Sequence, residues 1–264
     1  PNTVYNAAGG YLSICSGIKG YNVTVTNGAQ SGLASMAYAM SVLRSGQENA
    51  MLATGSDENS DIMTELFGKL GVTSEKVVAP FAGNDGFVLS DGSASILIED
   101  EKAAKERGAR IYCHASGYGM AHSSVKFGTL TGSEAGLTNA VNNALADAGM
   151  TIDDIDAVFG FANGMKAVDD VEIKGLTAVF GDKLAEKPVV ELKEVLGESR
   201  AAAATTAAAH AALMFAGKIP SQEAYSIAAD GSVSKTNVEA SKLNNVLVAA
   251  YGAGGSYTAI VLSK

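Results

Sequence analysis

Hydrophobic and polar positions along the chain alternate between two periods, one typical of strands and the other of helices. Runs that mix β-branched and polar residues, such as NVTVT at 22–26, predict strands. The expected strands are 22–26, 49–55, 86–98, 109–118, 156–161, 188–191, 245–251 and 256–262. The expected helices are 30–45, 60–70, 100–107, 134–148, 168–180 and 199–217. This order of strands and helices favours a layered α/β fold, and no linker-like stretch marks a domain boundary.

Two of the expected helices, 30–45 and 199–217, carry small or apolar residues on nearly every face. A helix without a polar face is buried on all sides. Each of the two follows a strand and a turn, which makes a weak internal repeat. The pair fits a helix layer between two sheets, as in the thiolase-like arrangement. An ordinary doubly wound sheet with one alanine-rich helix fits the same pattern.

The turn between the first expected strand and its helix reads NGAQSGLASM, from Asn27 to Met36. Enzymes often place a nucleophile at a strand end that faces a helix N-terminus, and this turn offers Ala29, Gln30 and Ser31. Ser31 would need a base beside it, and the sequence has no Gly-x-Ser-x-Gly motif here. We therefore expect Ser31 to cap and pack the helix instead of acting as a nucleophile.

Composition and charge narrow the class of protein. The 264 residues are 47% hydrophobic and 18% charged, so the chain can bury a sizeable core. A net charge of −9 disfavours a general nucleic-acid or anionic-membrane binder, because both need basic surfaces. Cys15 and Cys113 are far apart, which indicates a reducing, cytoplasmic setting without disulfides or a zinc site. The most apolar stretch, 201–217, is too short and too rich in alanine to span a membrane.

Several segments, taken in order, resemble the β-ketoacyl synthase family. PNTVYNAAGG at 1–10 resembles the stretch that enters the nucleophile strand, and 32–46, ending in LRSG, resembles the helix after the nucleophile. PFAGNDGFVLSDGSA at 80–94 and EKAAKERGARIY at 101–112 resemble two further family segments, and AVFG and YGAGGS follow in the family's order. The family's opening portion has no counterpart ahead of Pro1. That predicts a fragment, a processed product or one half of a split protein.

The resemblance implies the α/β thiolase-like fold with αβαβα layers. Residues 1–264 would then form a single ketosynthase domain that lacks its opening segment. Working members of the family use Cys-His-His. The cysteine holds the acyl chain as a thioester, the histidines polarise the malonyl thioester carbonyl, and a lysine and a glycine-rich loop complete the site. Such chemistry is helped by a helix N-terminus that lowers the thiol pKa and by N–H donors for an oxyanion.

The positions that match the family's catalytic residues carry other side chains here. Ala29 stands at the cysteine position, counted back from the LRSG end of the helix. Asn163, in FANGMK, is the best match for the first histidine, and Glu198, after KEVLG, replaces the second. Lys193 matches the family's lysine, and it either keeps a site role or neutralises Glu194 or Glu198. The histidines of the chain fall elsewhere, and we expect structural or surface roles for them: His114, His122 and His210.

One subfamily that keeps this fold without the triad is the chain-length factor, or ketosynthase β subunit, of type II polyketide systems. Its cysteine is usually replaced by glutamine in a Gln-Ala-Gly-Gly-Leu-like turn, whereas AQSGL here places Gln30 one position later. We expect Gln30 either at a subunit interface or as a hydrogen-bond donor at the old active site. YGAGGS matches the family's gating loop and, without a lysine, is not a phosphate loop. The expected interface or tunnel positions are Gln30, Ser31, Tyr251, Gly252, Gly254 and Gly255.

The resemblance implies a catalytically silent subunit. It would form a heterodimer with an active ketosynthase α subunit and control polyketide chain length. Condensation would use the partner's cysteine, and acyl carrier protein would deliver the chain on its phosphopantetheine, so this chain itself needs no cofactor. Two alternatives stay open. One is a condensing β-ketoacyl synthase whose cysteine has been replaced at Ala29, and the other is a non-catalytic binding protein of the thiolase superfamily.

Three further expectations concern partners and ions. A thiolase core cannot close its first sheet without the family's opening strands, and exposed sheet edges are a liability, so we expect the missing N-terminal segment to stay bound as a separate chain. The carboxylates at 153–156 and 169–170 lie at element ends, where they favour helix dipoles, and we expect no metal there. The basic residues of 102–110 are expected to form a solvated helix face or, alternatively, a contact for the carrier protein.

Overall fold

The structure is a computed structural model that describes residues 4–126 and 129–264; the first three residues of PNTVYNAAGG lie outside it. Its α-helices are α1 (Ala7–Ser16), α2 (Ser31–Arg44), α3 (Asp61–Lys69), α4 (Glu101–Glu106), α5 (Glu134–Ala148), α6 (Lys166–Phe180), α7 (Lys193–Leu196) and α8 (Ala201–Phe215). Its strands are β1 (Ala50–Asp57), β2 (Gly92–Glu99), β3 (His114–His122), β4 (Ala157–Phe159), β5 (Val189–Val190), β6 (Ser221–Ile227), β7 (Val233–Glu239), β8 (Asn245–Gly252) and β9 (Ser256–Ser263). Short 3₁₀ helices are η1 (Gly28–Gln30), η2 (Ile152–Asp154), η3 (Gly181–Glu186) and η4 (Ala240–Lys242).

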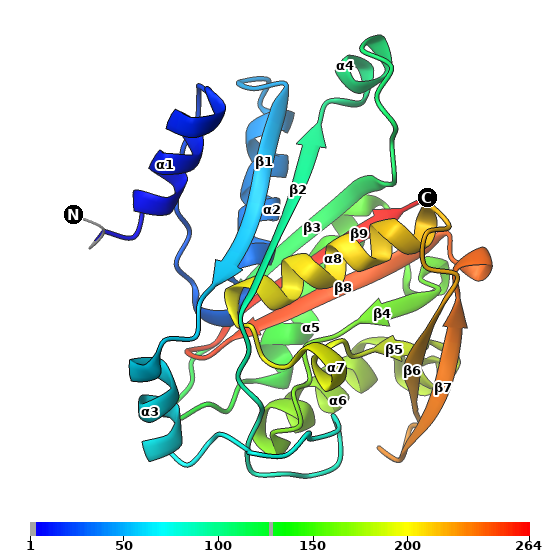
Figure 1. The fold of residues 1–264 in the computed structure, drawn as a ribbon. Helices are drawn as coiled ribbons and strands as arrows, with labels where there is room; N and C mark the ends of the chain where they lie inside the picture. Colours follow the sequence, from blue (N-terminus) through cyan, green and yellow to red (C-terminus); the bar gives the residue numbers. More distant parts are fainter. Residues whose placement is uncertain (1–3, 127–128) are drawn as a thin grey trace.

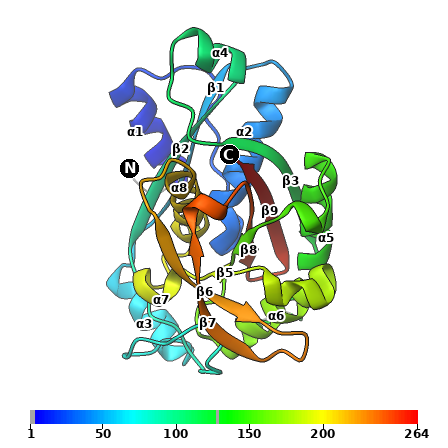
Figure 2. The ribbon, with the colours of Figure 1, turned by 90° about the vertical axis from the view of Figure 1, so that its right-hand side faces the viewer.

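The elements stack in layers, with α2 and α8 between two sheets (Figures 1 and 2). On one side of these helices lies the antiparallel pair β1–β2, and on the other lies a seven-stranded sheet in the order β3-β9-β8-β4-β5-β6-β7. Helices α5 and α6 cover the far face of the larger sheet. This arrangement is the expected thiolase-like fold, and it excludes the ordinary doubly wound sheet, which has no helix layer between two sheets.

Small residues allow α2 and α8 to approach each other and β1 closely. A methyl group on Gly32 of α2 would lie 2.2 Å from Thr205 Oγ1 and 2.3 Å from the Ala201 carbonyl oxygen, both on α8. A methyl group on Gly55 of β1 would meet the same two atoms at 2.5 and 2.4 Å. Only hydrogen fits at these crossings. The two helices without a polar face are therefore buried, as their sequences predict.

The larger sheet has its core at β8 and β9, whose residues are apolar almost without interruption. Because helices cover both faces of these two strands, side chains pointing either way are buried. Helix α5 faces them with Leu137, Ala140, Val141 and Ala144, which recur at the spacing of one helical face and are fully buried. The helix ends at Gly149, whose φ of 64° suits glycine best.

The expected strand at 22–26 is wrong. Residues 21–27 form no strand, and Tyr21 and Val23 are about half exposed. The Asn22 side chain bonds back to the Gly9 carbonyl and the Ser13 hydroxyl. Alternating β-branched residues favour an extended backbone, but a strand also needs a neighbouring strand to bond with, and the described part of the chain supplies none here.

Other expectations need correction at their ends. Of the strand expected at 86–98, only β2 forms, because 86–91 meets two other segments through isolated bridges at Phe87 and Leu89. The strand expected at 109–118 begins and ends several residues later, as β3. Helix α1 and the β6–β7 hairpin are additional. The hairpin lies at the sheet margin, where polar residues break the apolar alternation that would have predicted it.

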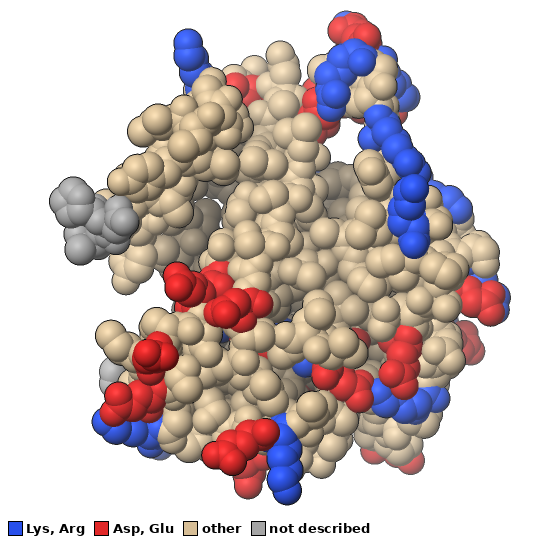
Figure 3. All heavy atoms as spheres, in the orientation of Figure 1, with Lys and Arg blue, Asp and Glu red and all other residues tan. Residues whose placement is uncertain are grey.

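Charged side chains are spread over the surface, and the face in Figure 3 carries few of them over β1 and β2. The expected solvated helix face is present on α4, where Lys105 pairs with Glu101 and both are largely exposed. Near it, Arg107 pairs with Glu99, and the Arg110 guanidinium lies over the Tyr112 ring. Across the described residues, no helix is both long and apolar enough to cross a membrane.

Candidate functional site

Ala29 lies in η1 (Gly28–Gln30), the turn that leads directly into α2. Ser31 closes this turn: its hydroxyl accepts a hydrogen bond from the Asn27 N–H at 2.7 Å and donates one to the Gly28 carbonyl at 2.6 Å. Ser31 is the first residue of α2 and not its N-cap, so the expected capping role becomes one of holding the turn. With its hydrogen committed to a carbonyl, Ser31 has the arrangement of a structural hydroxyl and not of an activated nucleophile.

Gln30 points into the protein. Its side chain is 0% exposed, and its Oε1 accepts a hydrogen bond from the Thr258 hydroxyl of β9. Gly252 of β8 makes room for it, because a methyl group there would lie 3.1 Å from Gln30 Cγ. Gln30 Nε2 has no hydrogen-bond partner among the described residues. Both roles expected for Gln30, at an interface or as a donor, stay predictions.

The YGAGGS turn joins β8 to β9 beside η1. Tyr251, Gly252 and Gly255 are buried, and Gly254 is exposed. The Tyr251 hydroxyl donates to the Leu130 carbonyl at 2.9 Å, and its ring lies 5.1 Å from that of Tyr257. The turn is thus anchored on one side and open at its tip, and its expected lining of a tunnel stays a prediction.

Three of the four positions that the sequence analysis matched to the family's catalytic residues come together in one buried network. Lys193 Nζ lies 2.7 Å from Glu198 Oε2 and donates to the Phe161 carbonyl at 3.0 Å. Asn163 Nδ2 donates to the same Glu198 oxygen at 2.9 Å. The Lys193 and Glu198 side chains are only 11% and 6% exposed. Of the two roles expected for Lys193, the structure supports neutralisation, and the partner is Glu198, because Glu194 pairs with Lys235 instead.

This convergence follows from the sheet. Strands β4 and β5 are parallel neighbours, so the loops at their carboxyl ends meet at one sheet edge. Asn163 lies in the loop after β4, and Lys193 and Glu198 follow β5. Glu198 is fixed further by its own backbone, whose N–H donates to the Val88 carbonyl at 2.7 Å.

Asp169, one of the carboxylates considered for a metal, instead holds the loop of Asn163 in place. It accepts hydrogen bonds from the backbone N–H groups of Phe81, Asn163 and Gly164 at 2.7 to 3.2 Å. Burial raises the pKa of Asp169, and these three donors and Lys193 act in the opposite direction. Within residues 4–126 and 129–264, no group of three or more His, Cys, Asp or Glu side chains is arranged to hold a metal ion.

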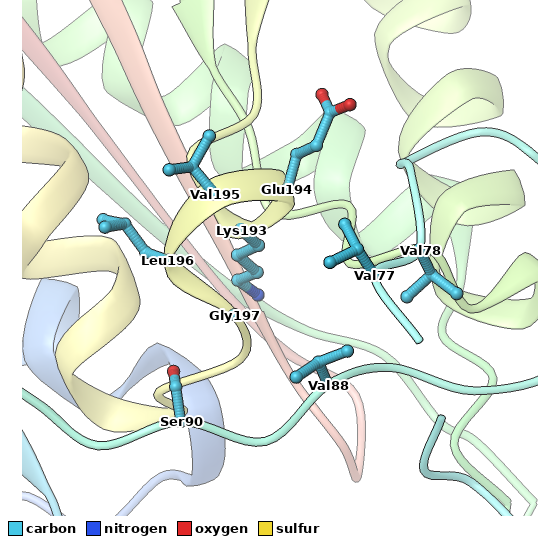
Figure 4. A pocket seen from close by; sticks show the side chains of 9 residues that line it. All are labelled: Val77, Val78, Val88, Ser90, Lys193, Glu194, Val195, Leu196 and Gly197. Atoms are coloured by element: carbon cyan, nitrogen blue, oxygen red, sulfur yellow. The ribbon is translucent and has the colours of Figure 1, made fainter. Parts of the chain in front are cut away.

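A cavity of about 120 Å³ opens beside this network (Figure 4). Its walls come from α7 and from the segments around Val78 and Val88, and Lys193 extends into the space between them. Val77 and Val195 at its mouth are 80% and 79% exposed. The single cationic group in the cavity wall is thus the ammonium that Glu198 already neutralises.

Three further side chains beside the network escaped the sequence analysis. Arg200 has a φ of 47°, unusual for a residue with a side chain, and its guanidinium bonds to Asp57 and to the Glu58 carbonyl, while its N–H donates to Glu198. The other two are Glu172 and Glu191, buried beside Gly160. A glutamate inside the apolar run VVEL was the available signal for Glu191.

The histidines lie away from the network. His114 and His122 are the first and last residues of β3, and His210 is on α8, with its ring 6.1 Å from that of Phe159. Burial lowers the pKa of His210, which favours the neutral imidazole. Their positions agree with the structural or surface roles expected from the sequence.

Cysteine reactivity offers a test of whether either thiol acts as a nucleophile. Burial raises the pKa of Cys113 to about 11, so that at pH 8 about one molecule in a thousand carries the thiolate. We expect iodoacetamide to modify exposed Cys15 readily and Cys113 hardly at all in the folded protein, and to modify both in urea. Peptide mass spectrometry over time measures this. Fast labelling of Cys113 in the folded state would contradict the burial.

Two family sequence profiles match nearly consecutive parts of the chain. The beta-ketoacyl synthase N-terminal domain matches residues 1–104, and the beta-ketoacyl synthase C-terminal domain matches residues 112–226. The chain belongs to the β-ketoacyl synthase family. The family predicted from the ordered segments is confirmed, and the network of Asn163, Lys193 and Glu198 lies within the part matched by the C-terminal domain of the ketosynthase.

Relatives among characterised proteins include the 3-oxoacyl-(acyl-carrier-protein) synthase 2 of Vibrio cholerae. It is 30% identical over 69% of this chain and 46% of its own length. The enzyme of the same name from Coxiella burnetii is 27% identical over 77% of this chain and 51% of its own. A putative polyketide beta-ketoacyl synthase 1 of Streptomyces halstedii is 27% identical over 94% of this chain and 61% of its own. The chain therefore spans about half to three-fifths of the length of these relatives.

Solved structures agree with the layers described above. The ishigamide ketosynthase/chain length factor superimposes with a TM-score of 0.80 at 25% identity, over 92% of this chain and 60% of the other. A type II polyketide acyl-carrier protein in complex with its ketosynthase, AntDE:AntF, gives a TM-score of 0.87 at 20% identity, over 99% and 67%. The second likeness shows the shared ketosynthase fold alone.

Proposed function

We propose that this ketosynthase-family chain is a catalytically silent subunit. It pairs with an active ketosynthase, shapes the polyketide tunnel and thereby controls chain length. One observation carries the proposal: Ala29 offers no nucleophile, and Asn163, Lys193 and Glu198 satisfy one another in a closed network. Chain transfer needs a free nucleophile and a base within reach of it, and these positions provide neither.

The partners follow from this proposal. The condensing cysteine belongs to the ketosynthase partner, and the growing chain arrives on the phosphopantetheine of an acyl carrier protein, so this chain needs no cofactor of its own. The likeness to a solved ketosynthase/chain length factor supports a heterodimer. A carrier protein appears with its ketosynthase in another related structure.

We also propose that further family strands pair with the free edge of β1 and complete the β1–β2 sheet into one thiolase-like domain. The Asp100 N–H donates to the Asn49 carbonyl, so Asn49 directs its backbone groups toward the strand that contains β2. Because this direction alternates along an antiparallel strand, every second residue of β1 directs its backbone groups away from β2. The β1 residues with outward backbone groups are Ala50, Leu52, Thr54 and Ser56, all uncharged. A two-stranded sheet has only marginal stability by itself, which favours the addition of further strands. Because the outward-facing β1 residues are uncharged, this edge does not repel an added strand. Intact-mass measurement of the complex from its native source should reveal such a segment, and its absence would refute this.

The main test is the identity of the bound partner. Affinity-tagged protein expressed in its native host is expected to co-purify with a ketosynthase that carries an intact Cys-His-His, in a one-to-one complex seen by native mass spectrometry. The complex should condense malonyl units on a carrier protein, and this chain alone should not. A stable monomer or homodimer without a ketosynthase would contradict the proposal and favour a binding protein.

A second candidate function is a condensing β-ketoacyl synthase, because the curated relatives carry that name. The variant Ala29→Cys separates the two. On the silent-subunit proposal, this variant of the isolated chain forms no acyl thioester with acyl carrier protein substrates and makes no condensation product. Acylation of the introduced thiol, followed by condensation, would support the enzyme instead.

A further inference from the structure

Two carboxyl groups are buried together behind the network, at the carboxyl end of β4. Glu172 comes from α6 and Glu191 follows β5, and they are 0% and 4% exposed. A methyl group on Gly160 would lie 1.8 Å from Glu172 Oε1 and 2.0 Å from Glu191 Oε1. The two side chains therefore reach the same point, and the absence of a side chain on Gly160 leaves room for both.

The protein supplies too few hydrogen-bond donors around this pair to stabilise two ionised carboxylates. Glu172 Oε2 accepts a hydrogen bond from the Phe161 N–H at 2.9 Å. The other three oxygen atoms, Glu172 Oε1 and both oxygens of Glu191, have no hydrogen-bond partner in the described structure. A buried carboxylate that lacks partners is costly, and a neutral carboxylic acid is far less so.

The charged groups near the pair do not remove this imbalance. Lys193 is the nearby cation, and it already donates to Glu198 and to the Phe161 carbonyl. Asp169 adds further negative charge. Burial raises the pKa of both Glu172 and Glu191, and the negative charge of Glu172 raises that of Glu191 further.

We propose that Glu172 and Glu191 form a proton-binding site, in which one carboxylic acid donates its hydrogen to the other carboxylate. The shared proton supplies the one donor that the surrounding protein lacks, and it lowers the charge of the pair from −2 to −1. The pair joins α6, which follows the loop of Asn163, to the end of β5, which leads into Lys193. This proton site is independent of whether the chain pairs with a ketosynthase.

The site makes stability depend on pH with a definite sign. The folded pKa values are raised, so the folded state keeps a proton that the unfolded state has released above the ordinary glutamate range. The contribution of the pair to the free energy of unfolding is fully present below the ordinary glutamate range. It is lost as the pH rises through the raised pKa values of the folded state. For each proton held only by the folded state, the unfolding equilibrium constant rises up to about tenfold per pH unit.

The pH profile of unfolding in the purified chain tests the site. Urea unfolding of wild type, Glu191→Gln and Glu172→Gln is compared from about pH 5 to pH 9, with Glu186→Gln as an exposed control near β5. A glutamine amide replaces the shared proton with a permanent donor. Both pair variants should therefore lose most of the rise in unfolding constant with pH, whereas the control keeps it. Equal profiles for wild type and both pair variants would overturn the proposal.

Infrared spectroscopy provides an independent readout that needs no unfolding. Wild type at pH 7 should show the C=O stretching band of a protonated carboxylic acid, shifted in deuterated buffer and missing from both glutamine variants. Absence of the band from wild type would overturn the proposal. So would stabilisation of wild type, but not of Glu191→Gln, by added sodium or potassium chloride over a choline chloride control, because the ligand would then be a cation.

Discussion

Lys193→Met is expected to lower the free energy of unfolding by about 3 to 5 kcal/mol, the usual cost of leaving one partner of a buried ion pair without its counter-charge. Glu198 keeps its bonds from Asn163 and from the Arg200 N–H, but its charge then lies 6% exposed without a cation in contact. Urea unfolding monitored by circular dichroism measures the change.

Two variants sharpen this result. Lys166→Met removes an equally close but exposed pair with Asp170, and it should cost less than about 1 kcal/mol. The double variant Lys193→Met with Glu198→Met should recover most of the loss, because Glu198 then no longer leaves a buried charge without its counter-charge. A cost for Lys193→Met no larger than that of Lys166→Met would show that the network does not stabilise the fold.

Gly32→Ala is expected to destabilise the protein by about 3 kcal/mol or more, at the upper end for overpacking a close-packed interior. The added methyl group would overlap the Ala201 carbonyl, and backbone cannot rotate away as a side chain can. Helices α2 and α8 would have to move apart, which opens the layer between the two sheets. Thermal and urea unfolding both measure the loss.

The matched control is Gly68→Ala in the exposed helix α3. There the nearest atom to the added methyl group is Thr73 Oγ1 at 4.0 Å, which is ordinary contact. Because alanine favours helices over glycine, this variant should be neutral or gain up to about 1 kcal/mol. Similar effects for the two glycines would mean that α2 and α8 do not pack as closely as described.

Much of the fold could be predicted because the local sequence patterns of several elements agree with the burial that these elements have in the folded protein. Helix α5 has the bounds expected from its periodicity, and the largely apolar β8 and β9 form inside the larger sheet, with neighbouring strands on both sides. The β-branched run at 22–26 has an equally clear pattern and forms no strand. The alternation records only the local preference of this segment. A strand also needs a second segment to which its backbone can hydrogen-bond.

The candidate site divides in the same way. The family's motifs located Ala29, Asn163, Lys193 and Glu198 by number, and the structure joins the last three through direct bonds. The motifs did not indicate that Gln30 is buried against Thr258, or that Glu172 and Glu191 meet at Gly160. These contacts link residues far apart in the chain, and no local spacing records them.

The sequence by itself determined the family and predicted the layered fold, because both depend on which residues occur and in what order. It also predicted that Ala29, Asn163 and Glu198 stand at the family's catalytic positions. Only the tertiary structure decided what the replacements do. Whether Lys193 is free or neutralised, and whether a buried glutamate must hold a proton, depends on which groups lie within a few ångströms and on how little water reaches them. These distances and the access of water are set only when the chain folds and packs.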